Sequence, residues 1–237
     1  MNWCTKISVP RTSAAVLVLL GLAVPGAGAA EVSLQEALQT PADDLAQAYL
    51  STNYVLQKIL PYAASGVVAT IHVGADEITA KNAADYTQRY EARREIYSVA
   101  MRQRGQLRLA GTYTGEATDS CARVGALWIS PILSGDATEI RIEQDGADAA
   151  LVVSMPLDGK IQSLRSEAAV VETSIVIVDP MNADYYFRGQ VEDGRVVIRP
   201  DIRVLSGWPD WASPPKRKDI LGCVVELTAV AVPAVAE

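Results

Sequence analysis

The chain has 237 residues, 49% of them apolar and 21% charged, which is the composition of a globular protein rather than of a disordered or polytopic membrane protein. It carries 21 Lys and Arg against 28 Asp and Glu, a net charge of −7, and this acidity argues against nucleic-acid binding. One histidine and three cysteines leave few residues for a zinc site or a histidine-based catalytic triad.

Residues 1–30 have the layout of a secretory signal peptide. Lys6 and Arg11 precede an apolar run over 13–24, and small residues follow over 25–30. The run is too short, and too soon interrupted by proline, for a membrane anchor. We predict cleavage after Ala29 or Ala30, export to the periplasm or the extracellular space, and no transmembrane segment in the mature chain.

Two cysteines remain after this cleavage, Cys121 and Cys223. An even pair in an exported protein favours a disulfide, and the alternative is two buried free thiols. No C-x-x-C motif occurs, so the predicted bond is structural rather than redox-active.

Residues 31–105 show helical spacing. Ser33 and Glu36 fit a capping box, and Pro41 followed by Asp43 and Asp44 fits a second helix start. An apolar stripe then continues until Pro61, where we expect the helix to stop. The next segment, 67–73, is β-branched and apolar, and its periodicity does not separate a strand from an extended crossover.

A second helical run begins near Asp76 and ends before Gly105. Tyr86, Tyr90 and Tyr97 recur along it at helical intervals, which favours a packing face. The alternative is a docking surface for another subunit, since tyrosine tolerates a partly hydrated interface. The two runs together predict a helical hairpin.

After Gly105 the hydrophobic period changes to two. Turn pairs at Asp145-Gly146, Asp158-Gly159 and Asp193-Gly194 separate short apolar strands. We expect eight or nine strands, at 107–113, 126–129, 139–143, 150–155, 161–164, 168–178, 184–191, 195–205 and 220–232. The fold class is therefore α+β: an N-terminal helical hairpin over 31–105, followed over 106–237 by an antiparallel β-barrel of lipocalin-like size or by a β-sandwich.

Cys121 follows the first predicted strand and Cys223 lies in the last. In a closed barrel these strands are neighbours, so the bond would join the seam, although a sandwich satisfies the same positions. Gly111-Thr112-Tyr113 is similar to the G-x-W of lipocalin-type barrels, but it spans three residues and has no tryptophan. It assigns no family.

Residues that could carry chemistry are sparse. His72 stands in an apolar run without an acidic neighbour within three residues, which is typical of a packed residue. No phosphate-binding loop, hydrolase elbow or metal-ligand spacing occurs, and we predict neither a cofactor nor a metal. A carboxylate-dependent hydrolase stays open as an alternative, because the fold alone sets which acidic residues meet.

The segment 206–218 is the most unusual in composition. It holds Trp208 and Trp211, three prolines, and the basic residues Lys216, Arg217 and Lys218. Tryptophan is enriched at binding hot spots and the basic triplet suits an anionic partner, so these five residues are our candidates for a contact. The alternative is a lid in which both indoles pack over one end of the barrel.

Together these features predict an exported non-catalytic binding protein that carries a small apolar ligand, such as a lipid, in its barrel. One alternative is an accessory subunit of a cell-envelope complex that docks through its helices, and a filled barrel would favour it. The other is a secreted carboxylate-dependent hydrolase, which would show as a cleft with neighbouring acidic residues, at least one of them desolvated.

Overall fold

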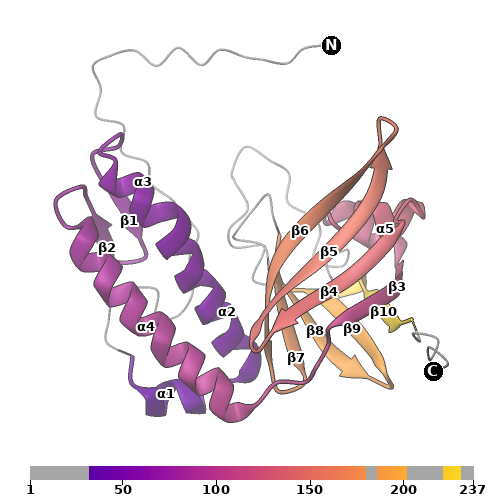
Figure 1. Ribbon diagram of the computed structural model, residues 1–237, viewed down its shortest axis with the longest axis horizontal. Coiled ribbons are helices and arrows are strands. Elements are labelled where there is room, and N and C mark those ends of the chain that lie inside the picture. The colour runs from indigo at the N-terminus through magenta and orange to yellow at the C-terminus, as the bar shows by residue number, and fades with distance from the viewer. Residues whose placement is uncertain (1–31, 180–185, 202–220, 231–237) are drawn as a thin grey trace, which may run out of the picture.

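The computed structural model describes residues 32–179, 186–201 and 221–230 (Figure 1). Helices come first in the chain and an antiparallel barrel follows, so the predicted α+β class is confirmed and the barrel is chosen over the sandwich. Helices α1 to α4 (residues 34–104) lie to one side of the barrel, and α1, α2 and α4 cover part of its outer wall (Figure 1).

The helical region begins with α1 (Leu34–Gln39), whose capping box is formed as predicted. Ser33 Oγ accepts the Glu36 N–H at 3.2 Å, and the Glu36 carboxylate accepts the Ser33 N–H at 2.8 Å. The second helix, α2 (Ala42–Tyr54), starts directly after Pro41.

The expected stop at Pro61 is wrong. The helix passes through a π-helical turn, η1 (Val55–Ile59), and continues as α3 (Leu60–Ala64). Proline lacks an N–H and its ring crowds the preceding turn, and a single π-turn is one way in which a helix accommodates such a break.

The second helical run also starts later than predicted. Residues near Asp76 form a hairpin of β1 (Ile71–Val73) and β2 (Asp76–Ile78), and α4 (Ala83–Arg104) begins only after it. α2 and α4 lie side by side and run in opposite directions (Figure 1). The predicted helical hairpin is thus present in part, with a small β-hairpin inserted between its helices.

Eight strands close the barrel in the order β10-β3-β4-β5-β6-β7-β8-β9. Every neighbouring pair is antiparallel, and the first and last strands, β3 and β10, pair at the seam. The strands are β3 (Gly111–Ala117), β4 (Glu139–Asp145), β5 (Asp148–Leu157), β6 (Lys160–Val171), β7 (Ser174–Val178), β8 (Tyr186–Glu192), β9 (Arg195–Pro200) and β10 (Val225–Ala229).

Turn chemistry sets most of the strand boundaries. Asp158 and Gly159, and likewise Asp193 and Gly194, all have positive φ, as two-residue hairpin turns require. The expected single strand over 168–178 is wrong, because Glu172 turns the chain with a φ of 54° and separates β6 from β7.

The expected strand over 126–129 is also wrong. This segment lies between a 3-10 turn, η2 (Asp119–Arg123), and α5 (Ser130–Ser134), and it inserts the fully buried Trp128 into the barrel core. An apolar run of four residues is compatible with a strand or a plug, and only the core it meets decides between them.

Three apolar clusters hold the fold together. One fills the barrel, and a second joins α1, α2 and α4 to the outward-facing residues of β6, β7 and β8. The third lies within the helical region, between η1, α3, the β1–β2 hairpin and the N-terminal part of α4. We call residues 42–104 the helical arm; its end distant from the barrel thus has a core of its own.

Candidate functional site

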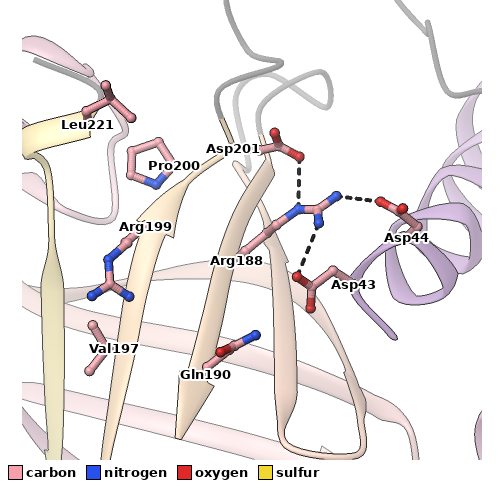
Figure 2. Close-up of a pocket in the computed structure, with 9 residues that line it drawn as sticks. All are labelled: Asp43, Asp44, Arg188, Gln190, Val197, Arg199, Pro200, Asp201 and Leu221. Atoms are coloured by element: carbon pink, nitrogen blue, oxygen red, sulfur yellow. Dashed lines mark hydrogen bonds and ion pairs between the residues drawn. The ribbon is translucent and has the colours of Figure 1, made fainter. Parts of the chain in front are cut away.

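A pocket of about 580 Å³ lies where the N-terminus of α2 meets the outer face of β8 and β9 (Figure 2). Its size is within the range of small-molecule sites. Figure 2 shows Asp43, Asp44, Arg188 and Asp201 together on one side, and Val197, Arg199, Pro200 and Leu221 on the other. The lining residues are Asp43, Asp44, Arg188, Gln190, Val197, Arg199, Pro200, Asp201 and Leu221.

Arg188 is the centre of the charged side. Its Nε donates to Asp201 at 2.9 Å, and its two Nη atoms donate to Asp43 at 3.2 Å and to Asp44 at 2.7 Å (Figure 2). A further bond, at 3.2 Å, goes to the side-chain oxygen of Gln47. We call these five residues the Arg188 cluster.

The cluster joins three parts of the chain that are far apart in sequence. Asp43 and Asp44 occupy the first turn of α2, where carboxylates stabilise the positive end of the helix dipole. Arg188 follows the inward-facing Phe187 and therefore points outward from β8, as alternation along a strand requires. Asp201 directly follows β9, where its N–H donates to the Tyr186 carbonyl at 2.8 Å.

Burial and charge act against each other in this cluster. Burial disfavours the charged guanidinium, but the attraction of the three aspartates outweighs it, and the pKa of Arg188 is raised. For Asp201 burial prevails over the attraction of Arg188, so the pKa of this carboxyl is raised above its usual value.

The Arg188 cluster acts as a clamp, in which one guanidinium on the barrel holds carboxylates from α2 and from the end of β9. A hydrolase was expected to bring carboxylates together in a cleft with at least one of them desolvated, and Asp201 meets that description. However, Asp43, Asp44 and Asp201 each accept a hydrogen bond from the same guanidinium, which fixes their positions. The geometry therefore supports attachment of the helical arm to the barrel better than proton transfer.

Side chains occupy the barrel interior, where the ligand of a carrier would lie. Trp128 and Phe187 are fully buried and meet edge to face, with ring centroids 5.1 Å apart. A Cβ on Gly115 would lie 2.6 Å from Ile140 Cδ1, and one on Gly189 would lie 2.6 Å from Ile175 Cγ2. At these two positions an added carbon would force a neighbouring core side chain to shift.

The structure buries two of the three tyrosines of the predicted stripe, one in the core of the arm and one where the arm meets α1 and the barrel. Tyr90 and Tyr97 are buried, and the Tyr90 hydroxyl donates to Asp76 at 3.0 Å. Tyr86 is half-buried, with the Arg89 guanidinium 5.5 Å from its ring centroid. Helix α4 thus directs two of the three rings toward neighbouring elements.

The other predicted contact residues, Trp208, Trp211, Lys216, Arg217 and Lys218, lie outside the described residues. His72 is half-buried on β1 opposite Glu77, away from the pocket. Cys121 and Cys223 form the predicted disulfide, with their Cα atoms 4.5 Å apart. Cys223 lies just before β10 rather than within it.

Within residues 32–179, 186–201 and 221–230, no three His, Cys, Asp or Glu side chains gather in a way that would hold a metal ion. None of the helices in those ranges has both the length and the apolar character needed to cross a membrane.

Sequence reasoning missed the Arg188 cluster. Asp43 and Asp44 were noted only as first-turn residues of a helix, and Arg188 is separated from Asp44 by 144 positions. The one local signal is that Arg188 directly follows the apolar Tyr186 and Phe187 in a strand, since an arginine needs a counter-charge when it is covered.

Comparisons of the chain with protein-family models, curated proteins and solved structures found no match.

Proposed function

We propose that the protein is an exported, non-catalytic accessory protein that docks onto a component of the cell envelope through its helical arm. The barrel, closed at its seam by the disulfide, acts as the rigid base that presents the arm. The signal-like segment at 1–30 and the Cys121–Cys223 bond support export.

The observation that carries this proposal is the packing of the barrel. An eight-stranded barrel is just wide enough either to be filled by side chains or to hold one small ligand. Here the fully buried Trp128 and Phe187 occupy the interior, and a Cβ on Gly115 or Gly189 would lie 2.6 Å from a core isoleucine. This packing favours docking over the carriage of a lipid.

The arm supplies the second support. Its far end has a separate core and lies away from the barrel (Figure 1). That end exposes 42% of Tyr62 and 72% of Val67, whereas Tyr90 and Tyr97 on α4 are buried. A projecting element with its own core can contact a partner without disturbing the barrel.

Cell fractionation of the full chain tests the proposal. We expect the mature protein to fractionate with the envelope, and Val67→Asp to release it into the soluble fraction. Leu107→Asp is the matched control, because Leu107 is 39% exposed but follows the opposite end of α4. Equal release of both variants, or a wild-type protein that is already soluble, would refute docking through the arm.

Native mass spectrometry separates docking from carriage. The purified mature protein should have its bare mass, reduced by the two hydrogens lost on disulfide formation. An added mass of a few hundred daltons that disappears on denaturation would support the carrier instead.

A further inference from the structure

Two separate tips of the molecule expose aliphatic side chains. The arm tip, residues 61–69, ends α3 and exposes 42% of Tyr62 and 72% of Val67. The hairpin tip, residues 155–162, joins β5 to β6 and exposes 43% of Leu157 and 64% of Ile161. Single exposed apolar residues are ordinary, but apolar side chains gathered at a projecting end are candidates for an interaction site.

Pairing shows why the hairpin tip projects. β4 pairs with β5 only as far as Ser154, and β7 pairs with β6 only from Ala168 onward. The tip lies beyond both limits, so within the described residues only β5 and β6 form it. Pro156 pairs with Ile161 on one face, while Leu157 pairs with Lys160 on the other, so both faces of the tip carry apolar residues.

Both tips lie on the same side of the molecule. In Figure 1 the end of α3 and the turn between β5 and β6 are both at the top, on either side of the view, while α1 and the end of α4 are at the bottom. A flat surface would therefore touch both tips at once. The surface of a bilayer is of this kind, because it extends in a plane past both contact points.

The charges at the tips also suit a lipid surface. The arm tip (PYAASGVVA) has no charged residue, although the chain as a whole has a net charge of −7. The hairpin tip has one acidic residue, Asp158, balanced by Lys160. Tyr62 adds an amphipathic ring of the kind that is enriched at membrane–water interfaces.

We propose that the arm tip and the hairpin tip together bind a phospholipid bilayer surface by inserting their exposed aliphatic side chains into its interfacial region. This inference rests on the proposed docking function and names its partner as lipid. The barrel then lies beside the membrane, with the two tips as separate contact points, and apolar burial rather than charge drives the binding.

Co-sedimentation of the mature, disulfide-bonded protein with phosphatidylcholine vesicles tests the inference. We expect wild type to bind, with a bound fraction that is unchanged between about 0.1 M and about 1 M salt, because no ion pair with the headgroups is required. Val67→Asp and Ile161→Asp should each weaken partitioning by about tenfold, because each replaces an inserted aliphatic side chain by a charge. Leu107→Asp should bind as wild type does.

Several results would overturn it: wild type that stays in the supernatant, binding that disappears in high salt, or Val67→Asp and Ile161→Asp variants that bind like wild type. Circular dichroism verifies that each variant is folded, and the two tips give independent tests if one variant is not. Envelope association without vesicle binding would refute the lipid partner and leave docking intact, with a protein as the partner. A loss of envelope association itself would refute docking.

Discussion

The disulfide offers the sharpest prediction from this structure. Cys121 lies in the 3-10 turn after β3 and Cys223 just before β10, and these two strands pair at the seam of the barrel. Both cysteines are buried in the barrel core. Replacing both with alanine removes the covalent link but leaves every hydrogen-bonded strand pair in place.

The size of the effect follows from the loop that the bond closes. The two cysteines are 102 residues apart, and a loop of about 100 residues contributes about 4.7 kcal/mol through the entropy of the unfolded chain. Measured effects are usually somewhat smaller, so we expect the double variant to lose about 4 kcal/mol. In a chain of this size that lowers the melting temperature by about 8–16 °C.

Calorimetry of the mature protein measures this difference directly. The double variant should melt at the lower temperature in both oxidising and reducing buffer, and reduced wild type should melt like the variant. Agreement between reduced wild type and the variant separates loss of the cross-link from loss of sulfur packing. A difference below about 2 °C, which corresponds to less than about 1 kcal/mol, would refute the seam link, as would two free thiols titrated in the oxidised protein.

Four further changes can be measured by urea unfolding. Arg188→Met should lower the free energy of unfolding by about 2–4 kcal/mol, because three carboxylates lose the guanidinium that they share. At the exposed Arg199, Arg199→Gln should lower it by less than about 1 kcal/mol. Equal losses would contradict the clamp. Gly189→Ala should lower the free energy of unfolding by about 1–3 kcal/mol, since its Cβ would lie 2.6 Å from an isoleucine methyl. An unchanged free energy of unfolding would indicate free space in the barrel interior. Ser166→Ala should leave the free energy of unfolding unchanged or raise it, because its buried hydroxyl has no hydrogen-bond partner in the part of the chain that the structure describes. A decrease above about 1 kcal/mol would show that the hydroxyl is hydrogen-bonded in the folded protein. Burial and the nearby Asp76 raise the pKa of Tyr90 in the folded protein. The protonated Tyr90 therefore contributes its full stabilisation below its ordinary pKa of 10.0, and this stabilisation is lost as the pH rises above that value. Tyr90→Phe should reduce the loss of unfolding free energy with pH in this alkaline range, and an unchanged loss would refute the pKa shift.

Local signals in the sequence predicted much of the fold correctly. The capping box at Ser33, the Asp-Gly turns at Asp158 and Asp193, and the change of period after Gly105 all depend on neighbouring residues. Such signals act over a few positions, and a single chain therefore displays them without an alignment. The two-cysteine argument also succeeded, because two cysteines within one chain allow only one pairing.

The errors have a common cause. Pro61 was expected to end a helix and residues 126–129 were expected to form a strand, but packing decided both. The helix continues through a π-turn because its far end has a core to complete, and the short apolar run becomes a plug because the barrel has an interior to fill. Propensity is a weak guide where tertiary contacts compete with it.

The candidate site could not be predicted from the sequence. Its charged residues form one cluster only because α2 packs next to β8 and β9 in the folded chain; they are Asp43, Asp44, Arg188 and Asp201. Charges interact strongly over a few ångströms of space, whatever their separation along the chain. The same holds for the two exposed tips, whose residues are separated by about 90 positions yet lie on one side of the molecule (Figure 1).

The sequence by itself determined the class of fold, the turns, the helix caps and the cysteine pair, since each follows from short-range geometry or from simple counting. Only the tertiary structure decided that the barrel closes at β3 and β10, that its interior is occupied by Trp128 and Phe187, and that one arginine holds three aspartates. These outcomes depend on how side chains from distant segments fill a shared volume and neutralise shared charge, which no local pattern encodes.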